Sequence, residues 1–230
     1  MLSRGAEQLG QRVSKITFDH QFQGQFGSFG AEDGRFIWPR SIDLDETGRV
    51  FVSDEHVNRI TIFDEEGAYR YHWGRSGSED GQLNGPSGIA FDSHGTIWVV
   101  DSLNHRVQSF SQIGEYQSKF GKQGGGDGDL EMPWGICVDH QDNIYVADWG
   151  NNRVQKFAPN GELLVKFECS STGVGSLKGP SGVAVDSAGD VYVTDWGNHR
   201  VQIYAADGHY ITALVGDAQD LSPWAQAYID

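Results

Sequence analysis

The sequence predicts an all-β protein, a β-propeller built from four-stranded antiparallel blades. The first observation is a repeat, because Pro39, Pro86, Pro133 and Pro180 are each separated by 47 residues without insertion or deletion. The second is that each period divides into four short stretches rich in β-branched and aromatic residues, bounded by Gly, Asn or Asp. The third is composition: 31 glycines and 12% aromatic residues are typical of many short strands joined by glycine turns. Stretches that are apolar on both sheet faces suit blades that pack against neighbours on either side.

The repeat sets the order of elements along the chain. Residues 1–29 are expected to form the outer two strands of a partial blade, because Arg12 and Phe26 stand 47 residues before Arg59 and Trp73. Residues 217–230 are expected to start a helix, with Ser222 as N-cap and Pro223 at the first helical position. Complete blades are expected at residues 30–76, 77–123, 124–170 and 171–216.

The third period shows how the strands are recognised. Its stretches are Trp134 to Asp139 (WGICVD), Asn143 to Asp148 (NIYVAD), Arg153 to Pro159 and Glu162 to Phe167. The aspartates that end the first strands are the first residues of sequences such as DETG and DSAG, which suit type I turns. These turns offer too few oxygens at alternating positions for a calcium loop, so we expect a structural role. The four aspartates at these turns are Asp45, Asp92, Asp139 and Asp186.

Charge and composition restrict the partners. Acidic residues number 32 against 17 basic ones, and the formal net charge of −15 disfavours nucleic-acid binding. No run of 18 apolar residues and no apolar signal segment is visible, so we expect no membrane partner and favour a cytoplasmic location. Two cysteines, Cys137 and Cys169, are too few for a disulfide scaffold and do not decide the compartment.

An aspartate and an arginine five residues apart flank the turn between the second and third strands of every blade. A carboxylate that ends one strand can meet a guanidinium that starts the next, and recurrence in each repeat favours a structural ion pair over a binding site. The predicted pairs are Asp54 with Arg59, Asp101 with Arg106, Asp148 with Arg153, and Asp195 with Arg200.

No catalytic, metal or cofactor site is predicted from the residues. The eight histidines are scattered, and none falls on a first strand, the strand that would line the central channel. Asp43 is the exception in its repeat position, where Ala90, Cys137 and Ala184 stand in the other blades. It could be a lone carboxylate of the channel, but such an exception is more often a solvated strand end, and one carboxylate without a partner makes no catalytic site.

Tryptophans provide the candidate binding surface. Trp73 and Trp98 occupy positions held elsewhere by other aromatic residues, so they are expected in the core. The remaining candidates stand in the turns between second and third strands or beside the repeat proline, which places them on one face of a propeller. Exposed aromatics on one face are typical anchors for a protein partner, although each could instead pack on its neighbouring blade. The candidates are Trp38, Trp134, Trp149 and Trp196, together with His56 in the equivalent turn of the first repeat.

The repeated signature resembles the NHL repeat. It stands as PSGIAFDSHGTIWVVDSLNHRVQSF from Pro86 to Phe110 and PSGVAVDSAGDVYVTDWGNHRVQIY from Pro180 to Tyr204. A weaker resemblance to the YWTD propellers rests on VYVTDWG at Val191 to Gly197. The NHL resemblance implies a ring, most often of six blades, of which this chain would be a fragment. It implies little chemistry, since the family includes interaction modules, RNA-binding domains and a few metal-dependent lyases.

The sequence therefore favours a non-catalytic scaffold that binds a protein or peptide, with acidic surroundings that suit a basic or neutral partner. The alternative is a metal-dependent lyase or hydrolase that acts on a small molecule in the central channel. RNA binding is a third reading, which the charge of the loops between blades disfavours. Oligomers are expected only if an incomplete ring closes between chains.

Overall fold

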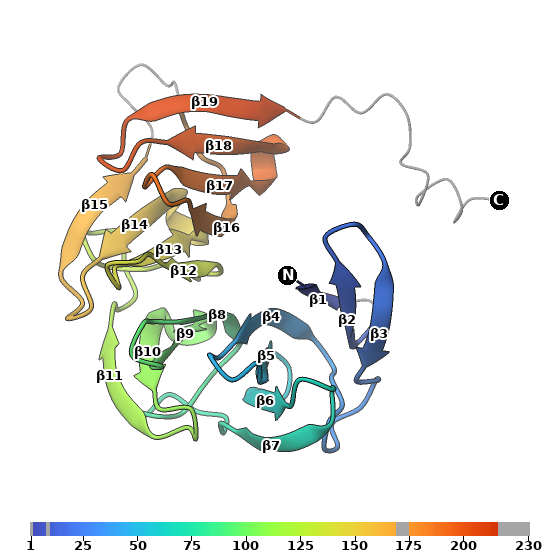
Figure 1. The fold of residues 1–230 in the computed structure, drawn as a ribbon. Helices are drawn as coiled ribbons and strands as arrows, with labels where there is room; N and C mark the ends of the chain where they lie inside the picture. Colours follow the sequence, from blue (N-terminus) through green and yellow to red (C-terminus); the bar gives the residue numbers. More distant parts are fainter. Residues whose placement is uncertain (1, 8–9, 169–174, 216–230) are drawn as a thin grey trace.

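The computed structural model describes residues 2–7, 10–168 and 175–215 of the protein. Within these residues the chain forms nineteen β-strands and three short 3-10 helices, and no α-helix. Figure 1 shows five sheets side by side around a common centre, four of them antiparallel four-stranded blades of a propeller ring. The predicted all-β propeller fold is confirmed. The helix expected at residues 217–230 lies outside the described residues.

The four complete blades share one topology, in which each strand pairs with the next along the chain. The first strand of each blade lies nearest the centre and the fourth lies at the rim (Figure 1). The strands are β4 (Pro39–Leu44), β5 (Val50–Asp54), β6 (Arg59–Phe63) and β7 (Tyr69–Trp73); β8 (Pro86–Phe91), β9 (Ile97–Asp101), β10 (Arg106–Phe110) and β11 (Tyr116–Phe120); β12 (Ile136–Val138), β13 (Ile144–Asp148), β14 (Arg153–Phe157) and β15 (Leu163–Phe167); β16 (Pro180–Val185), β17 (Val191–Asp195), β18 (Arg200–Tyr204) and β19 (Tyr210–Val215).

The amino-terminal sheet has three strands, one more than the two expected in residues 1–29. They are β1 (Leu2–Glu7), β2 (Arg12–Thr17) and β3 (Phe22–Phe26), paired antiparallel in that order. Opposite Arg12 lies Glu7, as Asp54 lies opposite Arg59 in the next sheet. By this register β1 occupies the place of a second strand, and its acidic end residue is glutamate instead of aspartate.

The hydrophobic core lies between successive blades. Phe51 and Ile60 of one blade pack with Ile89 and Val99 of the next in a single buried cluster. As predicted, Trp73 and Trp98 are buried, with 8% and 4% of their surface exposed. The first three complete blades bury both faces in this way, which is why both alternating sets of their strand residues are apolar, whereas in the last blade only alternate residues of β17 are buried.

Glycine in the first strand permits the inner strands of adjacent blades to approach closely. A Cβ on Gly135 would lie 2.7 Å from the carbonyl oxygen of Ser181 and 2.8 Å from the Cα of Gly182. Gly88 is similar, because its N–H donates to the Trp134 carbonyl at 2.8 Å and a Cβ would lie 2.6 Å from that oxygen. Glycine is therefore a packing requirement at these two positions, whereas the first complete blade has Ser41 at the equivalent place.

Short turns join the first and second strands, and the strand-ending aspartates organise them. The Asp139 carboxylate accepts hydrogen bonds from the N–H groups of Gln141 and Asn143, both at 2.9 Å, and lies 3.3 Å from the Lys156 ammonium. Burial acts to raise the pKa of Asp139, but the hydrogen bonds from Asn143 and Gln141 and the charge of Lys156 together lower it. A calcium-binding role is not needed to explain this residue.

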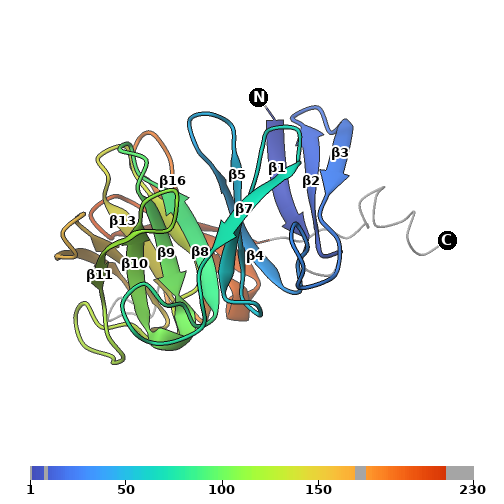
Figure 2. The same cartoon turned by 90° about the horizontal axis from the view of Figure 1, so that it is seen from below.

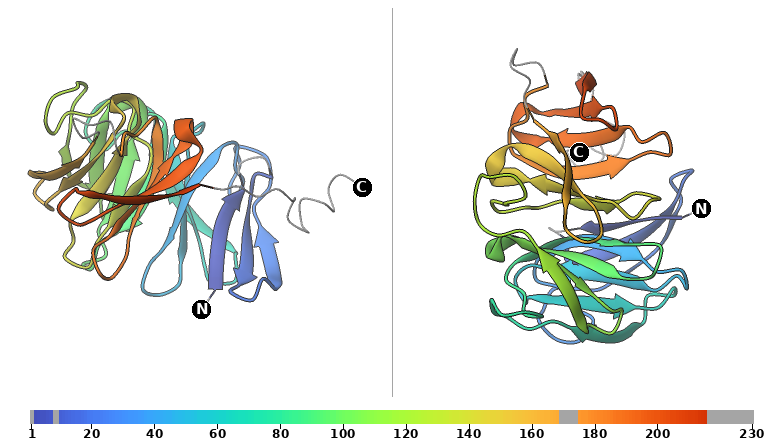
Figure 3. Two further views of the ribbon diagram at one scale, coloured as in Figure 1. Left: turned by 90° about the horizontal axis from the view of Figure 1, so that it is seen from above. Right: turned by 90° about the vertical axis from the view of Figure 1, so that its left-hand side faces the viewer.

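The strands run between the two faces of the arc (Figures 2 and 3). Turns between the second and third strands therefore open on the same face as the segments that lead into the first strands. We call this the loop face. Three of these turns form 3-10 helices: η1 (Ser102–Asn104), η2 (Trp149–Asn151) and η3 (Trp196–Asn198).

Gly135→Ala should lower the free energy of unfolding by about 1–3 kcal/mol, because the added methyl group forces β12 and β16 apart. Equilibrium denaturation with urea measures the change. Gly125→Ala is the matched control, since its Cβ would meet only the Asn151 Oδ1 at 3.5 Å. Equal stability of the two variants would contradict the packing role.

Asp139→Asn should lower the free energy of unfolding at neutral pH by about 1–3 kcal/mol, because charged hydrogen bonds are lost. A lowered folded-state pKa contributes stability above the usual value of 3.8, and this contribution disappears as the pH falls through the folded-state pKa. The difference between variant and wild type should therefore shrink below that value. A difference that is constant across the acid range would contradict the assignment.

Candidate functional site

A buried carboxylate stands behind each turn of the loop face. In the third complete blade, Asp148 Oδ2 accepts hydrogen bonds from Arg153 Nε at 2.8 Å, Asn151 Nδ2 at 2.9 Å and Gln155 Nε2 at 3.2 Å. Its Oδ1 accepts the N–H of Glu131 at 2.7 Å. All these donors face one fully buried side chain, so the carboxylate is saturated.

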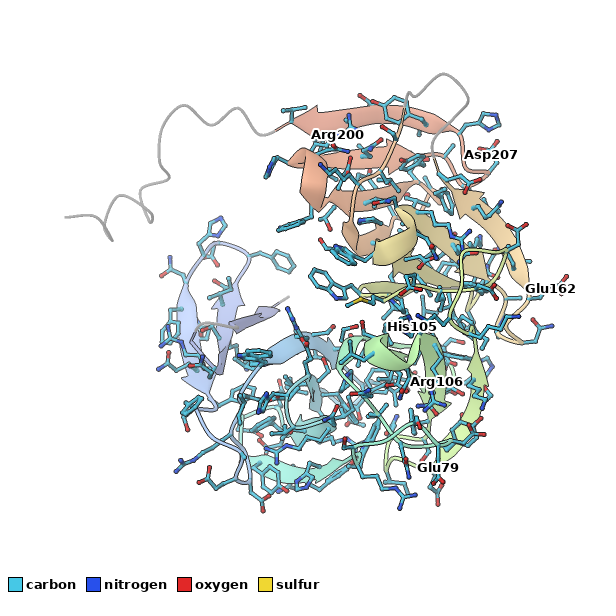
Figure 4. The ribbon with its side chains drawn as sticks, turned by 180° about the vertical axis from the view of Figure 1, so that it is seen from behind. Glu79, His105, Arg106, Glu162, Arg200 and Asp207 are labelled. Atoms are coloured by element: carbon cyan, nitrogen blue, oxygen red, sulfur yellow. The ribbon has the colours of Figure 1, made fainter. Side chains whose placement is uncertain are left out.

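The arginine of this network also anchors the loop that enters its blade. Arg153 donates from Nη2 to the carbonyl oxygens of Gly126 at 2.7 Å and Asp129 at 2.8 Å. Arg106 holds Glu79 and Gln82 in the same way, at 2.8 and 3.0 Å. Figure 4 shows Arg106 and Arg200 on their respective blades. These guanidinium hydrogen bonds all end on the chain's own backbone or side chains, which is the pattern of a scaffold.

Three of the four predicted ion pairs are present in the structure. The Nε to Oδ2 distances are 2.7 Å for Arg106 with Asp101, 2.8 Å for Arg153 with Asp148, and 2.8 Å for Arg200 with Asp195.

The predicted pair of Asp54 with Arg59 is wrong. Asp54 accepts the N–H groups of Ile37 at 2.7 Å and Trp38 at 3.1 Å, while Arg59 Nε donates to Thr61 Oγ1 at 3.2 Å. Thr61 replaces the glutamine of the other repeats, and Val57 replaces their asparagine. Without these two amide donors the hydrogen-bond network around the carboxylate does not form. Arg59 Nη1 still donates to the carbonyl oxygen of Ala31 in the loop that enters the blade.

Burial decides the charge behaviour of these carboxyl groups. Burial raises the pKa of Asp101 above the usual value, although hydrogen bonds from Asn84 and Arg106 act to lower it. Burial likewise raises the pKa of Asp148, against hydrogen bonds from Glu131 and Arg153. In the last blade burial again acts upward on Asp195, but Arg200, Asn198 and Lys178 outweigh it and lower the pKa. The Arg200 side chain is also more exposed than Arg106 and Arg153, at 26% against 8% and 5%.

The five predicted partner-binding residues lie on the loop face in two groups. Trp38 and His56 form an edge-to-face pair with ring centroids 5.5 Å apart. Trp134 and Trp149 stack with centroids 5.6 Å apart and an interplanar angle of 23°, and Trp149 and Trp196 line one pocket. Exposure is 47% for Trp38 and 64% for Trp196, whereas Trp134 and Trp149 are half-buried. We call these five side chains the aromatic row.

Arg40 connects the two groups and was missed from the sequence. Its Nε contacts the Glu55 carboxylate, and its guanidinium carbon lies 5.4 Å from the Trp134 ring centroid. The repeat offered a signal for it, because Ser87, Trp134 and Ser181 occupy the same position in the other blades. A lone cation among two serines and a tryptophan is a departure from the pattern.

Three small pockets open beside the aromatic row. The central pocket, about 280 Å³, lies where the first strands converge. Its lining comes from all four complete blades: Arg40, Ser41, Ser87, Gly88, Trp134, Gly135, Ile136, Ser181, Gly182 and Val183.

The other two pockets occupy the same repeat position between adjacent blades. The first notch, about 240 Å³, includes Trp38, His56 and Gly85, and the second, about 300 Å³, includes Trp149, Trp196 and Gly179. Each glycine N–H donates to an asparagine side chain at 2.8 Å, Asn58 for Gly85 and Asn152 for Gly179. Between these two notches the glycine position is held by Met132, whose N–H donates to His105 Nδ1 at 3.1 Å. Figure 4 labels His105 at this junction.

The residues of the central pocket do not fit a divalent metal. Hard divalent cations take carboxylate and carbonyl oxygens, and zinc takes cysteine, histidine or carboxylate, whereas this pocket presents a guanidinium and hydroxyl groups. Over the described ranges no group of three or more His, Cys, Asp or Glu side chains is placed to hold an ion.

Asp43 and Cys137 lie on first strands and have structural surroundings. Asp43 Oδ2 accepts the N–H of Phe91 in the next blade at 2.8 Å, and burial raises the pKa of Asp43 against this hydrogen bond. It is therefore a bridge between blades and not a solvated strand end. The pKa of Cys137 is raised to about 12, chiefly by burial and then by Asp139, so this thiol is a poor nucleophile.

Comparison with known families identifies the chain. The model of the SMP-30/gluconolactonase/LRE-like region matches residues 41–177, more than half of the sequence. The chain belongs to this family. The NHL repeat model matches residues 177–204 of the chain, which confirms the resemblance inferred from the repeat signature. No curated protein sequence matches it significantly.

Solved structures with the same fold include enzymes. A catalytically inactive virginiamycin B lyase from Staphylococcus aureus with quinupristin has 15% sequence identity and a TM-score of 0.69, covering 95% of this chain and 70% of the lyase. A streptogramin B lyase has 12% identity and a TM-score of 0.70, covering 95% and 66%. A gluconolactonase from Xanthomonas campestris has 19% identity and a TM-score of 0.70, covering 94% and 72%. At such identities the likeness establishes the fold, and the chain spans about 70% of the length of the virginiamycin B lyase.

The number of blades in the whole ring, predicted as six, stays a prediction. No helix long and apolar enough to cross a membrane occurs in the part of the chain that the structure describes.

Arg153→Gln should lower the free energy of unfolding by about 3–5 kcal/mol at neutral pH, because Asp148 loses its cation in a buried site. The loss should shrink as the pH falls toward the raised pKa of Asp148, since the protonated carboxyl needs no cation. Denaturant unfolding over a pH series measures both effects. Arg59→Gln is the control, because Asp54 does not depend on that arginine; equal losses and equal pH profiles would contradict the network.

Proposed function

We propose that this chain binds an extended segment of a protein or peptide across the loop face. The observation that carries the proposal is the aromatic row, which runs over all the complete blades but the second and borders three separate small pockets. Exposed tryptophans beside small concave sites are typical anchors at protein interfaces. The row itself is held by backbone contacts to buried aspartates, so it is organised before a partner arrives.

The size and spacing of the pockets favour a polymer over one small ligand. Each pocket holds between about 240 and 300 Å³, at or below the lower end for sites that enclose a drug-sized molecule. Separate pockets of this size suit successive side chains of an extended peptide. The chain's net charge of −15 favours partners that are neutral or basic overall.

A small-molecule enzyme is the second candidate, and family membership favours it. The family and the structural neighbours include lyases and a gluconolactonase. The unsuitability of the central pocket for a metal argues against a metal-dependent reaction within the described residues. Elemental analysis before and after chelation discriminates, because one tightly bound divalent ion per chain would favour the enzyme.

The double substitution Trp38→Ala and Trp196→Ala should weaken peptide binding by at least about tenfold in Kd. The peptide is one selected from a displayed library for binding to the wild-type chain. Fluorescence polarisation with the labelled peptide measures the change in Kd. Ile113→Ala is the matched control, because Ile113 is 64% exposed and lies in a turn between third and fourth strands, away from the loop face. Selected peptides that bind both variants equally would contradict the proposal.

A further inference from the structure

We propose that the central pocket is a carboxylate site: it takes a carboxylate joined to an apolar group, and Arg40 supplies the cation. This inference rests on the proposed function, because Arg40 and Trp134 belong to the same loop face. It goes further by assigning a chemical class to one anchor of the bound segment. The free carboxyl terminus of a peptide that ends in an apolar residue has this chemistry. A small aryl-substituted carboxylic acid has it too.

Arg40 is held in place with donors to spare. The Glu55 carboxylate engages Nε, and the Trp134 ring lies against the guanidinium, which fixes the plane of the group. Among the described residues no acceptor is recorded for Nη1 or Nη2 of Arg40. The side chain remains 26% exposed and lines the central pocket. A guanidinium with its two terminal nitrogens unoccupied matches a carboxylate in bidentate geometry.

The rest of the pocket complements such a ligand. Ser41 Oγ accepts the N–H of Ile89 at 3.3 Å, and within the described chain no acceptor is recorded for its hydroxyl hydrogen, which can therefore donate to an anion. Ile136 and Val183 form an apolar wall beside Trp134. No acidic side chain lines the pocket, and the Glu55 carboxylate is already engaged by Arg40.

The net charge of −15 does not prevent local binding of a carboxylate. At physiological ionic strength the Debye length is about 8 Å, so distant acidic side chains are largely screened while a guanidinium in contact with the ligand is not. The overall charge should slow the approach of a strongly acidic partner. A segment with one terminal carboxylate on an otherwise neutral or basic chain satisfies both conditions.

The test compares three probes that differ in one feature each. N-acetylphenylalanine carries the carboxylate, N-acetylphenylalaninamide lacks it, and 3-phenylpropionate lacks the peptide group. Calorimetric titration of the 230-residue chain at physiological salt should show the first binding at least about tenfold more tightly than the amide. If N-acetylphenylalanine also binds more tightly than 3-phenylpropionate, the site recognises the carboxyl terminus of a peptide. If the two affinities are equal, the ligand is a free small acid.

Arg40→Gln should remove the preference for the acid over the amide, and Arg40→Lys should keep part of it, because the charge remains without the fork. Arg35→Gln is the control, since Arg35 is a half-exposed loop arginine that pairs with Glu32. The wild-type comparison of acid with amide needs no variant, so the proposal stays testable if Arg40→Gln does not fold.

Equal binding of acid and amide, no binding of N-acetylphenylalanine at about 10 mM, or an acid preference that survives Arg40→Gln would overturn the carboxylate site. These results leave the proposed function separately testable. A selected peptide that still depends on Trp38 and Trp196 would keep the loop face as a binding surface without a carboxylate anchor.

Discussion

The aspartate that ends each second strand is the constraint on which the loop face depends. In all four complete blades its carboxylate accepts the N–H of the residue two places before the repeat proline, at 2.6 to 2.7 Å. That contact ties the entry to the first strand to the turn after the second strand. In the third complete blade it places the segment with Trp134 beside the turn with Trp149, and the two indoles stack. A buried charge that is fully hydrogen-bonded fixes geometry more than it adds stability.

The first complete blade shows what the constraint requires and what it does not. Asp54 keeps its contacts to the backbone at Ile37 and Trp38, and the loop face forms there as it does elsewhere. The ion pair with Arg59 is absent, and Thr61 and Val57 replace the amide residues that would bring the guanidinium to the carboxylate. Backbone anchoring is therefore the shared element, while the arginine pair is an addition that needs neighbouring amides. The recurring aspartate and arginine at a fixed spacing do not by themselves reveal that the ion pair also needs the neighbouring asparagine and glutamine.

The fold followed from the sequence because a 47-residue period averages over local ambiguity. Four copies of each strand and turn give independent evidence for the same element, so short strands that are individually uncertain become secure. The single unrepeated features were harder to predict. The strand Leu2–Glu7 lies where the repeat has lost its signature, and the stacking of Trp134 on Trp149 depends on the spatial approach of two blades. Arg40 needed the same spatial information, because its partners Glu55 and Trp134 are distant in sequence.

Positions that agree between repeats build the ring, and positions that differ give it a specific surface. The site before the repeat proline holds Trp38, Gly85, Met132 or Gly179, and the two glycines leave notches at equivalent places. The site after the proline holds Arg40, Ser87, Trp134 or Ser181, and all four line the central pocket. Substitutions at these two positions alter pocket size and charge while the buried aspartates remain. A repeated scaffold of this kind can change its ligand without changing its fold, and that is why the fold alone leaves the ligand undetermined.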